Sequence, residues 1–199
     1  MSNAILFQEI TIHLMHDEKP SVYLDELITK KAEEYPISML YRLKETKQSP
    51  IHHPEGTAFV HTIMVVDQAA KVKKKASNEA VFMWAALLHD IGKPNTTRNR
   101  KGKITSYDHD KVGHRLSEEF LSALTNDTTF IKQVSSLVRW HMQILFVVNS
   151  LPFADVKAMK QQVSVEDIAL LGYCDRMGRT NANHEKEERN IKEFIRLTK

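Results

Sequence analysis

Apolar residues recur at spacings of three and four positions along most of this sequence, and this pattern limits the chain to a largely helical fold. Leu24, Leu27 and Ile28 form one such run. Because the spacing matches the helical turn of about 3.6 residues, each run gives its helix one apolar face to bury. The pattern predicts helices near residues 22–34, 36–46, 57–74, 78–91, 109–125, 127–141, 164–177 and 180–197, while the first twenty residues give no clear assignment. We therefore expect an all-α fold.

One short β-hairpin near residues 96–106 is the expected exception. Gly102 lies between the β-branched pairs Thr96-Thr97 and Ile104-Thr105, as in a glycine-containing turn that joins two short strands. The chain shows no internal repeat, low-complexity tract or linker. We expect residues 1–199 to form a single domain, since a chain of this length can bury its own core.

The composition is that of a globular protein, with 42% hydrophobic and 27% charged residues. The formal net charge of +3 is too small to require a nucleic-acid partner, although Arg98, Arg100, Lys101 and Lys103 crowd one loop. No apolar run approaches the roughly 18 residues of a membrane span, and no leader pattern is present. Together with the lone Cys174, this leads us to expect a cytoplasmic protein without a membrane partner. An apolar helix surface could support a homodimer.

Histidines are concentrated in the middle of the chain. Seven of the ten lie between residues 52 and 141, namely His52, His53, His61, His89, His109, His114 and His141. His89 and Asp90 end the strongly apolar segment Val81–Leu88, and Gly92 and Pro94 stop the predicted helix just beyond them. Because an unpaired buried charge costs several kcal/mol, such a pair needs a partner there, and a divalent cation is one candidate.

Further metal ligands would have to come from other helices, because neighbouring helical residues point about 100° apart. His61 lies in one predicted helix, and Asp175 lies late in another apolar one, where an aspartate is out of place as a core residue. The alternative is that Asp175 forms an ordinary ion pair with Arg176 or Arg179.

Three segments carry a resemblance to a known family: residues 59–62 (FVHT), 87–94 (LLHDIGKP) and 174–179 (CDRMGR). A histidine, then His-Asp, then a distant aspartate is the pattern of the HD superfamily of metal-dependent phosphohydrolases, which this chain resembles. Residues 53–56 (HPEG), 107–113 (YDHDKVG) and the Gly178-Arg179 ending resemble, more narrowly, the HD domain attached to bacterial CCA-adding tRNA nucleotidyltransferases. The resemblance covers a motif core of about residues 50–182.

The resemblance implies an HD-type helical bundle and a metal centre. The residues matching the family's first metal site are His61, His89, Asp90 and Asp175. Some members bind a second metal through additional histidines, for which His109 and His141 are the candidates here, with Asp90 bridging. His114 departs from the pattern, since a small residue is usual there. The ligand set fits one or two ions of Mn, Fe, Ni, Co or Zn, and Mg is also allowed.

The implied reaction is hydrolysis of a phosphate mono- or diester by metal-activated water. The implied substrates are nucleotides or RNA ends, as for a 2′,3′-cyclic phosphodiesterase or a nucleotidase. Asp90 and Lys93 are the expected catalytic residues, and His53, Lys93 and Arg179 are expected to bind the substrate. The alternatives are surface solvation for Lys93, bracing of Asp175 for Arg179, and a role in a turn or helix cap for His53.

Two other functions stay open. The chain could be an HD phosphodiesterase for another nucleotide or a second messenger, or a non-catalytic RNA-binding module in which the metal is structural or lost. The intact ligand set argues against the binding module. Nucleotide addition is not expected, because no Gly-Ser followed by paired aspartates occurs and the chain is too short for a nucleotidyltransferase head.

Overall fold

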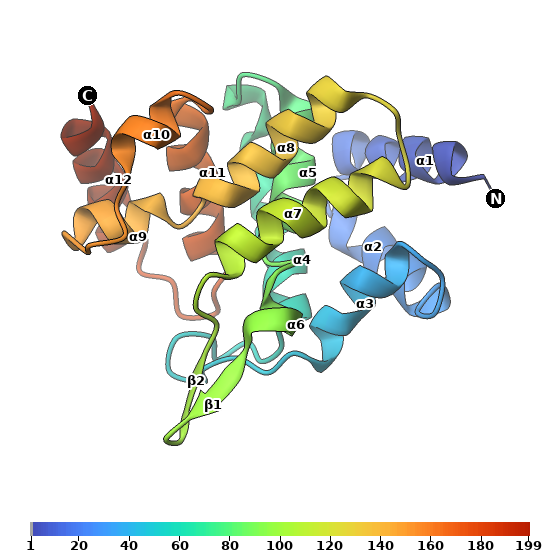
Figure 1. Ribbon diagram of the computed structural model, residues 1–199, viewed down its shortest axis with the longest axis horizontal. Coiled ribbons are helices and arrows are strands. Elements are labelled where there is room, and N and C mark those ends of the chain that lie inside the picture. Colours follow the sequence, from blue (N-terminus) through green and yellow to red (C-terminus); the bar gives the residue numbers. More distant parts are fainter. Residues whose placement is uncertain (1) are drawn as a thin grey trace.

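Helices form the body of the molecule in the computed structural model, which describes residues 2–199 (Figure 1). The first part of the chain contains α1 (Asn3–His16), α2 (Pro20–Lys30), α3 (Ile37–Glu45), α4 (Ala58–Val72), the 3-10 helix η1 (Lys73–Lys75), α5 (Glu79–Leu88) and α6 (Lys93–Thr96). After the strands β1 (Arg98–Arg100) and β2 (Lys103–Thr105) come α7 (His109–Ser122), α8 (Thr128–Trp140), α9 (Gln143–Val148), α10 (Val156–Lys160), α11 (Val165–Met177) and α12 (His184–Thr198).

Each helix predicted from the apolar spacing is present, with ends shifted by a few residues. Polar side chains fix several of the starts, because they accept a hydrogen bond from a backbone N–H that the helix itself leaves unpaired. Thr57 caps α4, Asn78 caps α5 and Ser164 caps α11 in this way. The predicted all-α class is therefore confirmed.

The helices α1, α6, α9 and α10 were not predicted. Helix α1 is apolar on opposite sides, since Leu6, Ile10 and Leu14 are buried while Ile5 and Ile12 are 53% and 56% exposed. It therefore lacks the one-sided pattern by which an amphipathic helix is detected. The other three contain only four, six and five residues, too few for any periodicity.

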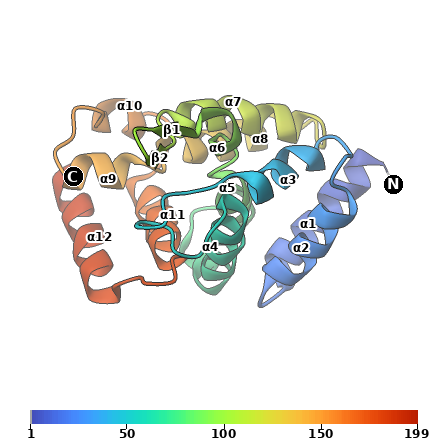
Figure 2. The same cartoon turned by 90° about the horizontal axis from the view of Figure 1, so that it is seen from below.

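Helices α4 and α5 lie at the centre of the bundle (Figure 2). Helix α4 packs against α2, α3, α5 and α11, and α5 also packs against α8, which pairs with α7. All residues from Val81 to Leu88 are buried. The polar residues that follow α5 are consequently enclosed by neighbouring helices.

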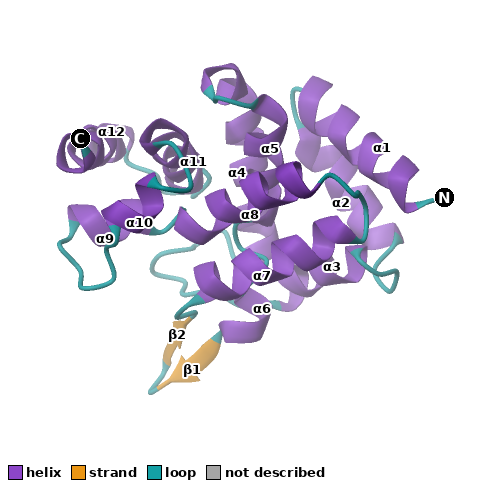
Figure 3. Cartoon of the chain, turned by 45° about the horizontal axis from the view of Figure 1, so that its top comes forward, coloured by secondary structure: helices purple, strands orange, loops and turns teal. Residues whose placement is uncertain are grey.

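The strands β1 and β2 form the predicted hairpin and project from the helical body (Figure 3). They pair antiparallel, with Arg100 opposite Lys103. The two turn residues, Lys101 and Gly102, have φ of 51° and 78°, the left-handed conformation of a tight two-residue hairpin turn. Among the described residues, no helix combines the length and the apolar composition needed to cross a membrane.

Candidate metal centre

The end of α5 is the centre of a buried cluster of histidine and aspartate side chains. His89 is the residue that caps the C-terminus of α5, and Asp90 follows it. His61 comes from α4, His109 is the first residue of α7, and His141 caps the C-terminus of α8. Residues far apart in the sequence thus meet at one point, with Asp175 of α11 beside them.

The first ligand group consists of His61, His89 and Asp90, whose candidate ligand atoms all lie within 4.8 Å of one another. Asp90 Oδ2 lies 3.3 Å from His89 Nε2 and 3.9 Å from His61 Nε2. Asp175 adjoins the group, because its Oδ1 lies 3.0 Å from His61 Nε2. The residues predicted for a first metal are therefore brought together by the fold.

The second ligand group consists of Asp90, His109 and His141, again within 4.8 Å of one another. His109 Nε2 lies 3.4 Å from Asp90 Oδ1 and 3.1 Å from His141 Nε2. The two carboxylate oxygens of Asp90 thus face different groups, Oδ2 the first and Oδ1 the second. This is an arrangement suited to a bridging carboxylate.

Three of the histidines each donate a hydrogen bond to a backbone carbonyl, and this bond fixes the tautomer of each ring. Each donates its Nδ1–H to the carbonyl oxygen three residues earlier: His89 to Ala86 at 2.9 Å, His109 to Ser106 at 2.8 Å and His141 to Val138 at 2.7 Å. A carbonyl oxygen only accepts, so Nδ1 must carry the proton, and the neutral ring then has its lone pair on Nε2. Metal-binding histidines are typically held in this way.

These lone pairs converge inside the protein. The Nε2 atoms of His109 and His141 are 3.1 Å apart, and the buried Nε2 of His89 has no hydrogen-bond partner within residues 2–199. Burial lowers the pKa of His109, and burial together with the neighbouring His109 and His89 lowers the pKa of His141 to about 3. Protonation therefore does not relieve the repulsion at neutral pH. A divalent cation would relieve the repulsion by accepting these lone pairs, and nitrogen and carboxylate ligands suit such an ion. The residues present therefore fit a divalent metal.

Glu55 is a residue of the site that the sequence did not reveal as a partner of His61. Its side chain is 1% exposed, and its Oε1 lies 3.0 Å from His61 Nδ1 and 2.8 Å from His53 Nδ1. Burial acts to raise the pKa of Glu55, but the contacts with His61 and His53 outweigh it and lower the pKa to about 2. The ionised carboxylate lies beside Nδ1 of His61, whereas Nε2 of the same ring lies toward the two aspartates.

Lys93 is buried beside Asp90, so the alternative of a solvated surface lysine is wrong. Its Nζ lies 2.7 Å from Asp90 Oδ2 and donates to Gln48 Oε1 at 2.5 Å. Burial acts to raise the pKa of Asp90, but the neighbouring His89 and the charge of Lys93 hold that pKa well below its usual range. Asp90 is consequently ionised and available to a cation.

Asp175 contacts both His61 and Arg179, so its ion pair and its place in the cluster coexist. Arg179 Nη2 lies 3.3 Å from Asp175 Oδ1, which agrees with the bracing role considered for Arg179. Burial acts to raise the pKa of Asp175, but Arg179 and His61 hold it well below its usual range. The alternative partner is wrong, because Arg176 pairs with Glu187 instead, at 3.3 Å.

His53 and His114 lie outside both ligand groups. The side chain of His53 is 13% exposed at the edge of the cluster, where burial and the charge of Lys93 lower its pKa to about 4. His114 donates through Nδ1 to the Ser135 carbonyl at 3.0 Å, and its Nε2 lies 3.7 Å from Glu118. His114, which stands where the family usually has a small residue, therefore lies away from the cluster.

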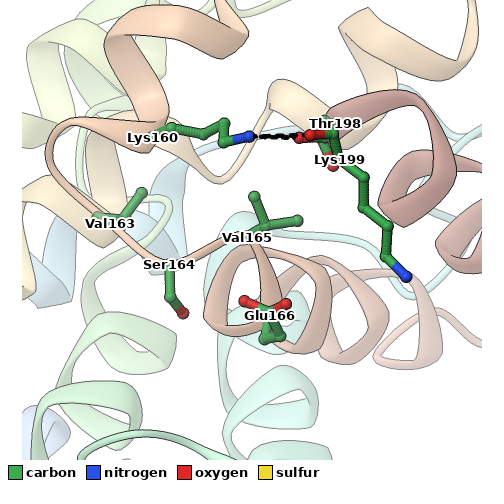
Figure 4. Close-up of a pocket in the computed structure, with 7 residues that line it drawn as sticks. All are labelled: Lys160, Val163, Ser164, Val165, Glu166, Thr198 and Lys199. Carbon is green, nitrogen blue, oxygen red and sulfur yellow. Dashed lines mark hydrogen bonds between the residues drawn. The ribbon is translucent and has the colours of Figure 1, made fainter.

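A surface hollow of about 350 Å³ lies elsewhere, between α10, the start of α11 and the end of α12 (Figure 4). It is lined by Lys160, Val163, Ser164, Val165, Glu166, Thr198 and Lys199. Glu166 is its one acidic side chain, and no histidine lines it. In the part of the chain that the structure describes, three groupings of histidine and acidic side chains are close enough for a metal: the two ligand groups, and His53, Glu55 and His61, which adjoins the first group through His61.

Comparison with known families agrees with this geometry. Residues 58–171 match the family described as the HD domain. The chain belongs to the HD-domain family. It is therefore an enzyme of the HD superfamily of metal-dependent phosphohydrolases, for which a divalent metal is required. The HD-domain match includes both ligand groups, whereas Asp175 lies just past its end.

Curated relatives of this HD-domain protein include proteins that are several times longer than the matched segment. It is 32% identical over 121 residues to the multifunctional CCA protein of Actinobacillus pleuropneumoniae, covering 61% of this chain and 29% of that protein. It is 42% identical over 97 residues to that of Halorhodospira halophila, and 30% identical over 97 residues to the A-adding tRNA nucleotidyltransferase of Deinococcus radiodurans. Each of these two matches covers 48% of this chain and 21% of the relative.

Proposed function

We propose that this protein hydrolyses phosphate mono- or diesters of nucleotides or RNA ends, in the manner of a 2′,3′-cyclic phosphodiesterase or nucleotidase. The observation that carries the proposal is that Asp90 presents one carboxylate oxygen to each of two converging ligand groups. The proposed metal ligands are His61, His89, Asp90 and Asp175 for one ion and Asp90, His109 and His141 for a second.

A divalent ion bound there, whether Mn, Fe, Ni, Co, Zn or Mg, supplies charge neutralisation at the phosphoryl group and lowers the pKa of a water molecule. The side chains of the protein position the ester. Lys93 adds a fixed positive charge beside Asp90. Arg179 contacts Asp175 through Nη2, and its buried Nε–H has no hydrogen-bond partner among the residues that the structure describes. A phosphate oxygen could accept a hydrogen bond from this Nε–H.

His53 is suited to a hydroxyl group of the substrate. Its low pKa keeps the ring neutral, and its Nδ1 lies 2.8 Å from Glu55 Oε1. When Nδ1 donates to that carboxylate, Nε2 is left as an acceptor. An acceptor suits an O–H donor such as a ribose hydroxyl or an attacking water, and it does not suit a phosphate oxygen. A ribonucleotide would offer such a hydroxyl.

The relatives support RNA ends as the substrate class, because their names refer to CCA or tRNA nucleotide addition. The chain spans less than a third of these relatives, so their nucleotide-adding activity is not transferred to it. A single domain over residues 1–199, a cytoplasmic location and a homodimer stay predictions from the sequence.

The test is elemental analysis of the purified protein together with hydrolysis assays on a panel of phosphate esters that includes 2′,3′-cyclic nucleotides. We expect up to two metal ions per chain and turnover that a chelator abolishes and added metal restores. Turnover that is unaffected by chelation would contradict the proposed reaction. If no metal binds after addition, the non-catalytic RNA-binding module becomes the better explanation.

A further inference from the structure

The β1–β2 hairpin is attached to the metal centre at both of its ends. The chain enters β1 from α6, whose first residue, Lys93, contacts Asp90. It leaves β2 toward His109, which belongs to the second ligand group. The hydroxyls of Thr97 and Ser106 lie 2.7 Å apart and tie the base of the hairpin together. Each strand has three residues, which span about 10 Å at the usual rise per residue of a strand. The hairpin projects from the helical body (Figure 1).

The hairpin carries an unusual concentration of positive charge. Its cations are Arg98, Arg100, Lys101 and Lys103, all exposed. Four cations exceed the formal net charge of +3 of the whole chain, so the remainder of the protein is net acidic. Residues 91–107 contain no aspartate or glutamate. Within residues 2–199, none of the four cations forms an ion pair, which leaves them available to an external anion.

An aromatic residue lies between the hairpin and His109 in the sequence. Tyr107 is 66% exposed and stands two residues before His109. The guanidinium of Arg100 lies over the ring, 4.9 Å from its centroid. A large aromatic side chain held at the surface by an arginine provides a flat face on which an unpaired base can stack. Alternating cationic and aromatic groups are the usual means of holding a single strand without reading its sequence.

We propose that the hairpin and Tyr107 form a docking arm for single-stranded RNA, which delivers the terminal phosphate of the strand to the metal centre. This inference rests on the proposed function and narrows its substrate from nucleotides in general to the ends of oligoribonucleotides. The cations meet the backbone phosphates upstream of the end, and Tyr107 stacks on a base next to the reacting group. An acidic protein would use the cations but has no need of an exposed aromatic ring next to the ligand groups.

The experiment compares hydrolysis of 2′,3′-cyclic AMP with that of a six-nucleotide RNA ending in a 2′,3′-cyclic phosphate. For the metal-loaded wild-type protein at low salt, we expect kcat/KM to be at least roughly tenfold higher for the hexamer, and the advantage to shrink as salt is raised. The double variant K101E/K103E should bring the ratio of the two kcat/KM values close to one.

The chain offers a matched control for charge. Lys74 and Lys75 are exposed neighbours in η1, which follows the C-terminus of α4. The ligand His61 lies near the opposite end of α4. The double variant K74E/K75E makes the same change in net charge and should keep the wild-type ratio. Tyr107→Ala should raise KM for the hexamer roughly tenfold, whereas Tyr107→Phe, which retains the ring, should not.

Direct binding of a fluorescently labelled hexamer separates this proposal from the proposed function. Hydrolysis of both substrates at equal efficiency, with no effect of K101E/K103E, would overturn the docking arm and leave the hydrolase intact. Hairpin-dependent RNA binding without any hydrolysis would retain the arm and reject the proposed reaction. If poly-glutamate competes with the labelled hexamer as strongly as RNA does, the RNA docking arm would also be overturned, because the surface would then fit an acidic protein.

Discussion

The two ligand groups share Asp90 but are stabilised differently. In the first group, His61 lies between the carboxylates of Glu55 and Asp175. In the second, His109 and His141 are held by backbone carbonyls, and Asp90, which contacts His109, is the one carboxylate of the group. Because anionic ligand charge strengthens cation binding, we expect the first group to bind its metal more tightly. Each group can therefore be weakened separately.

Removal of Asp90 should have the largest effect, since it is common to both groups. We expect Asp90→Ala to lose both metals and to lower kcat/KM by about a thousandfold or more, because metal catalysis contributes several kcal/mol. Elemental analysis and phosphoester turnover measure the two effects. Asp90→Asn, which keeps the shape beside Lys93, should behave similarly.

The matched control for Asp90 is Asp67→Asn. Asp67 lies on α4 and accepts hydrogen bonds from Ser21, away from the cluster. This variant should alter the melting temperature more than the metal content. Full activity of the Asp90 variants would reject the shared-carboxylate arrangement.

Substitution in the second group should remove one metal only. We expect His141→Ala to lower the metal content from two ions to one and to reduce turnover by about a hundredfold, since the first group retains its own ligands. His114→Ala is the control, because His114 makes a similar contact with a backbone carbonyl but lies outside both groups. Equal loss of metal in the two variants would show that the second group is not a metal site.

Glu55→Gln should weaken the first group without removing any proposed ligand. The amide keeps the volume but loses the negative charge beside His61 Nδ1. Loss of such an outer partner typically costs about 10- to 100-fold in metal affinity. Calorimetric titration should show the tighter binding step weakened and the weaker step unchanged, while exposed Glu45→Gln leaves both unchanged. A change in the weaker step alone would mean that the first group is the weaker metal site.

Two glycines allow the smallest and most selective changes. A Cβ at Gly92 would lie 2.1 Å from the His109 carbonyl oxygen, and one at Gly178 would lie 2.5 Å from Val65 Cγ2 and 2.9 Å from Val65 N. Gly92→Ala should therefore displace α7 and weaken the second group, whereas Gly178→Ala should separate α11 from α4 and weaken the first. Each should cost about 1–3 kcal/mol of stability.

The two glycine variants serve as controls for each other. In a metal titration, Gly92→Ala should weaken binding to the second group and Gly178→Ala binding to the first, each by a few-fold. Identical profiles would mean that the two groups do not respond independently.

The sequence predicted the main helices and the hairpin because their signals are local. It also predicted which six side chains would meet, through the family pattern, although their role as ligands stays a prediction. It could not reveal that Lys93 is buried, since its neighbours Gln48 and Asp90 are adjacent only in space. Glu55 was missed as a partner of His61 because it lies in a loop, where no periodicity relates a side chain to the helix it supports.

The backbone hydrogen bonds of His89, His109 and His141 also affect how much folded enzyme a cell can maintain. With their tautomers fixed, the inward lone pairs repel one another whenever the cation is missing, and the empty cluster opposes folding. A cation that binds only the folded chain offsets this, by about 2.7 kcal/mol at one hundred times its Kd. Metal shortage should therefore reduce the abundance of the protein as well as its turnover, because the unfolded fraction is open to proteolysis.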